Sequence, residues 1–186
     1  ESLEDAMPAQ VLHAASEAFR ERRADVERGS RESVEALRRA SAAEVGAEGR
    51  DTGTGLLDEA VAIMARQYDP AHGGFGTAPK FPQPVTLEVL LRHHARTGEP
   101  QALRMALHTL RRMADGGLRD QLAGGFHRYS VDERWLVPHF EKMLYDNALL
   151  AQVYLDAWRL TGEGDLRAVA EDTLDHLLSD LRAPEG

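Results

Sequence analysis

The connections between the predicted helices alternate between two kinds, and this alternation constrains the fold more than any other feature. Short Thr-Gly-Glu turns follow the segments that end at Arg96 and Leu160, whereas longer loops carry Gly-Gly-Phe at 73–75 and 124–126. Gly-stopped turns of this length join antiparallel helices. Both Gly-Gly-Phe loops would then lie on one rim, and residues 184–186 would begin a third loop there. The sequence therefore predicts a repeating array of antiparallel αα-hairpins.

The segments between these connections have helical periodicity. Apolar residues recur three and four positions apart, and several segments begin with proline, which is favourable at the first helical position. No segment shows the sustained alternation of a strand, so we expect an all-α chain. The predicted helices cover 8–28, a second amphipathic piece after Gly29, and then 56–68, 84–96, 100–114, 138–160 and 165–181.

Composition suggests three parts and excludes several kinds of function. Residues 1–45 are a helical tail, 46–55 are a Gly-rich linker, and 56–186 hold the hairpins of roughly half a closed ring. The net charge of −9 argues against nonspecific binding to nucleic acid or an anionic membrane. No apolar run approaches the ~20 residues that span a bilayer, so the expected location is cytoplasmic. The chain has no cysteine and no HExxH pattern, and we expect no metal and no cofactor.

The stretch 116–147 is chemically the densest part of the chain. It places acidic, basic and aromatic residues in a long loop punctuated by glycines, and such loops are more often functional than not. His127 directly follows the second Gly-Gly-Phe and could shuttle protons, because the ordinary pKa of histidine is ~6.5. The alternative is a histidine that only holds the loop together by hydrogen bonds.

The helix predicted at 138–160 would carry further candidates on its first turns. The helix dipole would favour the neutral form of His139 near its N-terminus. Two pairs would lie one turn apart, Glu141 with Tyr145 and Lys142 with Asp146. A pair such as the second is more often a surface ion pair than a catalytic dyad.

Other residues flank the same rim. Asp120 and Asp132 lie in Gly-rich or polar loops, where an aspartate often only forms a turn. Trp135 could stack on a sugar face or anchor the loop on the helices. The first Gly-Gly-Phe loop brings Lys80 and Phe81 to the same side.

Long motifs at 75–82, 124–132 and 137–148 resemble the spermatogenesis-associated protein 20 family, whose bacterial members are labelled thioredoxin-domain-containing proteins of the YyaL type. The resemblance is strong over 56–186 and loose over 1–45. It implies a thioredoxin-like domain joined to an (α/α)6 toroid like that of six-hairpin glycosidases and N-acylglucosamine 2-epimerases. This chain lacks the thioredoxin-like domain, so 1–45 would be the helical tail that follows it.

The toroid resemblance implies a carbohydrate-processing module whose pocket opens on the Gly-Gly-Phe rim and binds a sugar-like small molecule. In an epimerase or isomerase, His127 and His139 would be the acid/base pair. In a glycoside hydrolase, Asp120 and Glu141 would be the two carboxylates. The expected substrate-binding residues are Lys80, Phe81, Arg128, Tyr129, Asp132, Trp135, Lys142, Tyr145 and Asn147.

Two other interpretations stay open. The module could be a non-catalytic binding or scaffold partner of the thioredoxin-like domain, in redox or protein maintenance. The motifs could also be purely structural and lock the loops to the helices. In each case half a ring would expose apolar helix faces, so the chain should self-associate or show a large apolar patch.

Overall fold

The computed structural model describes residues 3–45 and 53–183, and the chain divides into two units, Glu1–Asp51 and Thr52–Gly186. Most of the predicted linker, at 46–52, and the predicted third loop at 184–186 lie outside the described residues. Among the described helices, none is long and apolar enough to cross a membrane.

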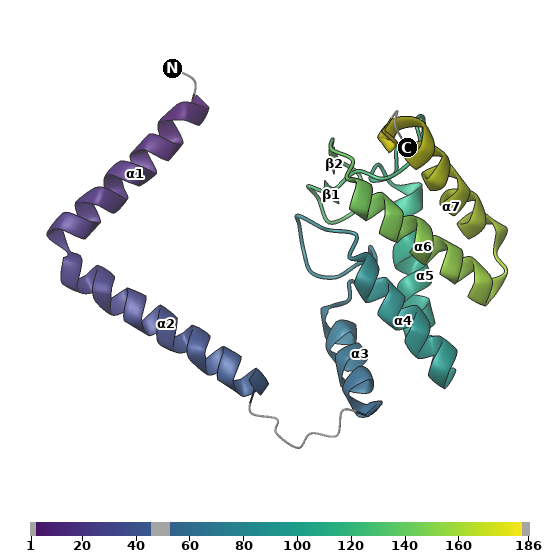
Figure 1. The fold of residues 1–186 in the computed structure, drawn as a ribbon, viewed down its shortest axis with the longest axis horizontal. Helices are drawn as coiled ribbons and strands as arrows, with labels where there is room; N and C mark the ends of the chain where they lie inside the picture. The colour runs from purple at the N-terminus through teal and green to yellow at the C-terminus, as the bar shows by residue number, and fades with distance from the viewer. Residues whose placement is uncertain (1–2, 46–52, 184–186) are drawn as a thin grey trace. The chain divides into compact units, whose positions relative to one another are not determined.

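The first unit consists of α1 (Leu3–Glu21) and α2 (Arg23–Val45) (Figure 1). The predicted break at Gly29 was wrong, because the helices part at Arg22 and Gly29 lies inside α2. A glycine inside a helix costs only ~1 kcal/mol, which the surrounding helical sequence overcomes.

The second unit is built from two helical hairpins with a further helix before them (Figure 1). The prediction of an all-α chain is confirmed. Its helices are α3 (Gly55–Gln67), α4 (Pro84–Thr97), α5 (Pro100–Asp115), α6 (Leu144–Thr161), α7 (Gly164–His176) and the short π-helix η1 (Leu177–Leu181).

The Thr-Gly-Glu turns end one helix and begin the next. Gly98 and Gly162 adopt left-handed backbone conformations with φ of 73° and 76°, which glycine reaches without steric cost. The Glu99 carboxylate accepts the N–H groups of Gln101 and Ala102 and so caps α5. The glycine and the capping glutamate thus place the end of α4 and the start of α5 close to their predicted positions.

The predicted start of the helix at 138–160 was wrong, since α6 begins at Leu144 rather than at 138. Residues Pro138–His139 form the strand β2, which pairs antiparallel with β1 (Tyr129–Ser130). Met143, immediately before α6, is still extended at φ −100° and ψ 136°. Tertiary contacts override the local preference of residues 138–143 for a helix, because the strand pairing and the Lys142 side chain hold this segment against the preceding loop.

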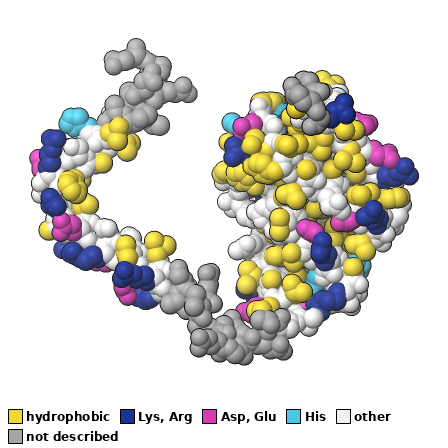
Figure 2. Space-filling view, in the orientation of Figure 1, with side chains coloured by type: hydrophobic (Ala, Val, Ile, Leu, Met, Phe, Trp, Pro, Cys, Tyr) yellow, Lys and Arg dark blue, Asp and Glu magenta, His cyan; other side chains and the backbone are white. Residues whose placement is uncertain are grey.

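The core of the second unit lies between α4, α5 and α6 and continues under the loops. Leu87, Leu110 and Leu150 are completely buried there. Phe126 stacks on Tyr154 with ring centroids 5.4 Å apart, so the second Gly-Gly-Phe loop is part of this core. Figure 2 shows apolar side chains gathered on the face where β1, β2 and the start of α6 lie. The exposed apolar residues of that part of the chain include Val137, Phe140, Leu144 and Leu149.

Candidate functional site

The first Gly-Gly-Phe loop is closed by a buried ion pair. Asp69 accepts two backbone N–H groups of the following turn through Oδ1. Its Oδ2 accepts from Lys80 Nζ at 2.6 Å. Lys80 Nζ also donates to the carbonyl oxygens of Gly73 and Glu133, both at 2.9 Å. This arrangement of aspartate, lysine and glycine carbonyl is called the clamp below.

The second Gly-Gly-Phe loop contains the same clamp. Asp120 Oδ1 accepts the N–H groups of Leu122 and Ala123, and its Oδ2 accepts from Lys142 Nζ at 2.8 Å. Lys142 Nζ also donates to Gly124 O at 2.7 Å. The hydrogen bond from Lys142 and those from the two backbone N–H groups hold the pKa of Asp120 well below its usual range. Asp120 is therefore an ionised residue that shapes the loop.

The two loops touch each other on one rim of the unit. The backbone groups of Lys80 and Ser130 exchange two hydrogen bonds, of 2.8 and 2.9 Å. Trp135 Nε1 donates to His72 O at 2.9 Å, and the indole is completely buried. The prediction that both loops lie on the same rim is confirmed.

The second glycine of each Gly-Gly-Phe is required by close contacts. Gly74 and Gly125 have φ of 79° and 70°, and a Cβ on them would lie 2.5 Å from Trp135 and 2.4 Å from His176. Only glycine fits such positions without strain. These contacts fix the backbone of each loop and with it the position of the residue after the phenylalanine, which in the second loop is His127.

A group of side chains, partly or fully exposed and called the rim cluster below, surrounds the base of the β1–β2 hairpin. Arg128 Nη1 donates to Glu141 Oε2 at 3.0 Å, and the backbone N–H of Arg128 donates to Glu141 O at 2.7 Å. His139 Nε2 lies 3.5 Å from the same Glu141 oxygen. The rim cluster consists of Phe81, His127, Arg128, Tyr129, His139, Glu141 and Tyr145.

Aromatic rings line the rim cluster. Tyr129 stacks on His139 with centroids 4.8 Å apart and an interplanar angle of 7°. The ring centroid of Phe81 lies 4.8 Å from that of Tyr129. The rings of His127 and Phe140 pack edge to face, with their centroids 5.3 Å apart. The strand pairing of Tyr129 with His139 explains the stack, because cross-strand partners share one face.

Burial shifts the pKa values of His127 and Asp146, in opposite directions. Burial and then the nearby Lys142 lower the pKa of His127, so its imidazole is neutral at pH 7, and its Nδ1 is buried without a hydrogen bond. Burial raises the pKa of Asp146, and only the charge of Arg128 opposes this shift. Asp146 is 9% exposed.

Three expectations that depended on a helix from 138 were wrong. His139 is in a strand, so no helix dipole acts on it from that position. Glu141 binds Arg128 and does not share a helical face with Tyr145. Lys142 pairs with Asp120 instead of Asp146, which is buried.

Several predicted substrate-binding residues make contacts within the protein. Lys80, Trp135 and Asn147 are completely buried. Asn147 accepts from Phe126 N at 2.6 Å and donates to Phe126 O at 3.0 Å, which ties α6 to the second loop. Asp132 accepts the N–H groups of three residues in the hairpin turn. Their contacts hold the loops and leave the rim cluster as the exposed chemistry.

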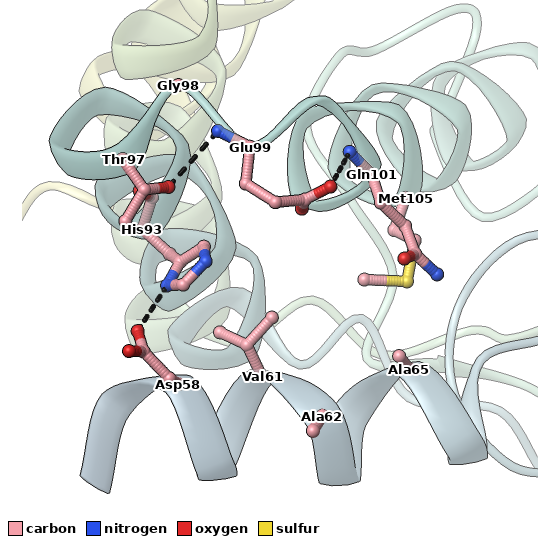
Figure 3. A pocket seen from close by; sticks show the side chains of 10 residues that line it. All are labelled: Asp58, Val61, Ala62, Ala65, His93, Thr97, Gly98, Glu99, Gln101 and Met105. Carbon is pink, nitrogen blue, oxygen red and sulfur yellow. Dashed lines mark hydrogen bonds and ion pairs between the residues drawn. The ribbon is translucent and has the colours of Figure 1, made fainter. Parts of the chain in front are cut away.

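A cavity of about 590 Å³ lies elsewhere, between α3, α4 and the start of α5 (Figure 3). Its two carboxylates, those of Asp58 and Glu99, already have partners. Asp58 pairs with Arg96 and lies 3.6 Å from His93 Nδ1, and Glu99 caps α5. This cavity is beside a Thr-Gly-Glu turn and includes no member of the rim cluster.

Comparisons with known proteins identify relatives for about two thirds of the chain. No family model matches it. A segment of 123 residues is 46% identical to spermatogenesis-associated protein 20 of Rattus norvegicus and 48% identical to that of Homo sapiens. This segment is 64% of the chain but 16% of each relative, so the chain spans about one sixth of the length of these curated relatives.

Solved structures with a similar fold are carbohydrate enzymes. Cellobiose 2-epimerase from Bacillus thermoamylovorans matches with a TM-score of 0.62 and 15% identity over 72% of this chain and 39% of its own. Cellobiose 2-epimerase from Spirochaeta thermophila has a TM-score of 0.59 and 25% identity over 75% and 36%. A D-mannose isomerase has a TM-score of 0.57 and 16% identity over 70% and 36%.

These matches settle the fold, which is part of a six-hairpin (α/α)6 toroid as predicted. The resemblance that the motifs indicated is also confirmed, because the homologues of this chain are proteins of the spermatogenesis-associated protein 20 family.

Proposed function

We propose that the rim cluster binds a sugar and transfers a proton next to its carbonyl group, as an epimerase or isomerase does. One observation carries the proposal. The exposed imidazole of His139 stacks on Tyr129 and contacts Glu141, on the loop rim of a fold shared with two cellobiose 2-epimerases and a D-mannose isomerase. A fold alone does not fix a function, so the side chains of the rim cluster supply the argument.

The proposed chemistry needs one group that removes a proton from the carbon beside the carbonyl and one that returns a proton. Histidine suits both steps near neutral pH. His127 is neutral at pH 7 because of its lowered pKa, and it can therefore accept a proton. His139 is half exposed, and Glu141 can orient its ring through the contact of 3.5 Å. Return of the proton to the opposite face of the same carbon gives the epimer. Return to the former carbonyl carbon, with transfer of the proton of the carbon-2 hydroxyl to the former carbonyl oxygen, gives the isomer.

The glycosidase alternative is less well supported by the contacts. It needs one carboxylic acid whose pKa is raised so that it can protonate the leaving oxygen. Asp120 has the opposite property, since Lys142 and the backbone hold its pKa well below the usual range. Glu141 is committed to Arg128 in an ion pair of 3.0 Å. Asp146 is the carboxyl group whose pKa burial raises, but it is only 9% exposed. For these reasons proton transfer at carbon is the preferred proposal.

The experiment is hydrogen exchange at carbon 2 of the sugar. The protein is incubated in D2O with mannose, glucose or cellobiose, and proton NMR follows the loss of the carbon-2 signal of the reducing sugar. We expect deuterium incorporation that falls by about 10²–10⁴-fold in His127→Ala and His139→Ala, the usual contribution of general acid–base catalysis. His13→Ala, an exposed histidine of α1, is the control that keeps the rate. Exchange no faster than without protein would refute the proposal.

A second candidate function is supported by exposed apolar residues on the same rim. Leu122 is 99% exposed and Phe140 is 80% exposed, as expected of a surface that binds another protein. In this alternative the module works without catalysis beside a thioredoxin-like domain. Leu122→Ser with Phe140→Ser should then abolish binding to such a domain, whereas His127→Ala should leave it intact. Retained binding by the double variant would exclude this surface.

A further inference from the structure

We infer that a second site, separate from the rim cluster, binds the phosphate group of a small phosphomonoester in a cavity between the end of α3 and α5. The cavity has a volume of about 400 Å³ and begins where the first Gly-Gly-Phe loop leaves α3. It contains no member of the rim cluster, so the inference does not depend on the proposed function. The residues that line it are Tyr68, Pro70, Gln101, Arg104, Met105 and His108.

Three polar side chains of the lining lie on one face of α5. Gln101, Arg104 and His108 occupy positions i, i+3 and i+7 of this helix. Residues three and four positions apart are neighbours on a helix surface, with about 5–6 Å between their Cβ atoms. The helix therefore presents an amide, a guanidinium and an imidazole to the same cavity, and the oxygens of one phosphate group can accept hydrogen bonds from all three.

Tyr68 makes His108 a hydrogen-bond donor toward the cavity. The Tyr68 hydroxyl is hydrogen-bonded to His108 Nδ1, and the two rings meet edge to face with centroids 6.1 Å apart. Burial raises the pKa of Tyr68, and burial followed by the charge of Arg112 lowers the pKa of His108, so both groups are neutral at pH 7.

The direction of this hydrogen bond follows from the acidity of the two groups. A phenol is a stronger acid than a neutral imidazole, so the Tyr68 hydroxyl donates and His108 Nδ1 accepts. The proton of the imidazole is then on Nε2. His108 Nε2 is not buried and has no hydrogen-bond partner among residues 3–45 and 53–183, so it can donate to a ligand.

Two arginines of the same helix have no acidic partner within hydrogen-bonding distance. Arg104 is exposed and makes no hydrogen bond or ion pair with a described residue. Its charge acts on Glu99, but that carboxylate already accepts two backbone N–H groups at the start of α5. Arg112, one turn after His108, has a buried Nε without a hydrogen bond. Because the chain has 31 acidic residues for 22 basic ones, two such arginines on one helix point to an anion from outside the chain.

The carboxylate next to the cavity does not repel such an anion strongly. Asp69 follows Tyr68 directly, and its charge is compensated by Lys80 in an ion pair of 2.6 Å. Its other oxygen accepts two backbone N–H groups of the loop. The acidic groups around the cavity are thus occupied, whereas the guanidinium of Arg104 and the Nε2 of His108 are available.

The apolar part of the lining indicates that the ligand is an ester and not a bare ion. Met105 is 3% exposed and Pro70 is exposed, and both contribute apolar atoms to the wall of the cavity. Met105 also lines the larger cavity beside α3, together with Gln101 (Figure 3). A phosphate held by α5 would leave its organic group against these apolar side chains.

The first test uses the unmodified protein and NMR of its histidine rings. Long-range ¹H–¹⁵N spectra give the tautomer of His108, whose signals are assigned by their loss in His108→Gln. We expect the Nε2–H tautomer, and we expect the Nε2 signal to shift on titration with inorganic phosphate and with phenyl phosphate. Phenyl phosphate should bind several-fold more tightly, because its ring contacts the apolar wall. Unchanged His108 signals with both compounds would overturn the inference, and equal affinities would overturn the assignment of an ester.

Variants then assign the binding to this face of α5. Arg104→Gln should weaken the binding of phenyl phosphate by about tenfold or more, because it removes a charged hydrogen bond. Arg134→Gln is the matched control, since Arg134 is also exposed and forms no ion pair with a described residue, and it should leave the affinity unchanged. An equal loss in both variants would show a general attraction between charges and would overturn the inference.

Tyr68→Phe tests the role of the hydroxyl as a positioning group. The variant keeps the ring but removes the donor to His108 Nδ1, so His108 should populate both tautomers and phenyl phosphate should bind several-fold more weakly. The same ¹H–¹⁵N spectra measure the tautomer, which loss of packing alone would not change. A retained Nε2–H tautomer with retained affinity would contradict the assignment of the hydrogen bond.

Discussion

Lys80→Met removes the charge of the more buried clamp while it nearly keeps the volume of the side chain. In the structure Lys80 Nζ donates to Asp69 Oδ2 at 2.6 Å and to the carbonyls of Gly73 and Glu133 at 2.9 Å. The variant leaves these three acceptors without their donor. Breaking a buried ion pair costs about 3–5 kcal/mol, and each buried acceptor left unsatisfied costs about 1–3 kcal/mol. Because Asp69 is 18% exposed and can regain some water, we expect a loss of about 3–5 kcal/mol.

The second clamp supplies the matched comparison. The Lys142 side chain is 15% exposed and donates to one carbonyl, so Lys142→Met should cost only about 1–3 kcal/mol. Urea unfolding followed by tryptophan fluorescence measures both free energies, and Trp135 reports directly on the loops. A cost below about 1 kcal/mol for Lys80→Met would show that the first clamp behaves as a surface ion pair, and equal costs for both variants would show that the difference in burial has no effect. Either result would refute this reasoning.

Three further predictions concern the same region. Gly125→Ala should destabilise the protein by about 2–5 kcal/mol, because the added Cβ would clash with His176 and the backbone would be strained. Gly76→Ala, at a similar φ but in open space, should cost only about 1–2 kcal/mol. Thermal unfolding of the two variants measures this difference. The free energy of unfolding should fall as the pH drops below about 4, because the Asp120 carboxylate, whose pKa is lowered in the folded state, stabilises the fold only while it is ionised. In an acid titration, Lys142→Met should show a shallower fall, because it removes the main cause of the lowered pKa. We also propose that the chain self-associates through exposed apolar helix faces, so light scattering should give a mass above 20.5 kDa that Leu178→Asp lowers; an unchanged mass would contradict this.

The hairpin array was predictable because its signals are local. Proline at Pro84 and Pro100 and glycine at Gly98 and Gly162 mark helix ends through backbone geometry alone. The shared rim followed from the alternation of loop lengths. The pattern Asp-x-x-x-Gly-Gly-Phe begins at Asp69 and again at Asp120, so the sequence itself marks both clamps.

The details of the rim cluster could not be derived from local sequence. Pro138 resembles a first helical residue, yet the pairing of His139 with Tyr129 depends on a contact across the hairpin. The burial of Asp146 depends in turn on where α6 begins. The domain assignment, a thioredoxin-like partner and a cytoplasmic location stay predictions.

The two clamps close in the same way around loops of very different length. Lys80 follows Phe75 after a short run, whereas Lys142 follows Phe126 only after the whole β1–β2 hairpin. The hairpin is thus held between two fixed points, and its turn is tied to the first loop by the buried Trp135 indole and by the Glu133 carbonyl. For protein engineering, a change of ligand specificity would keep these contacts and vary the exposed residues of the hairpin, such as Val131 and Leu136.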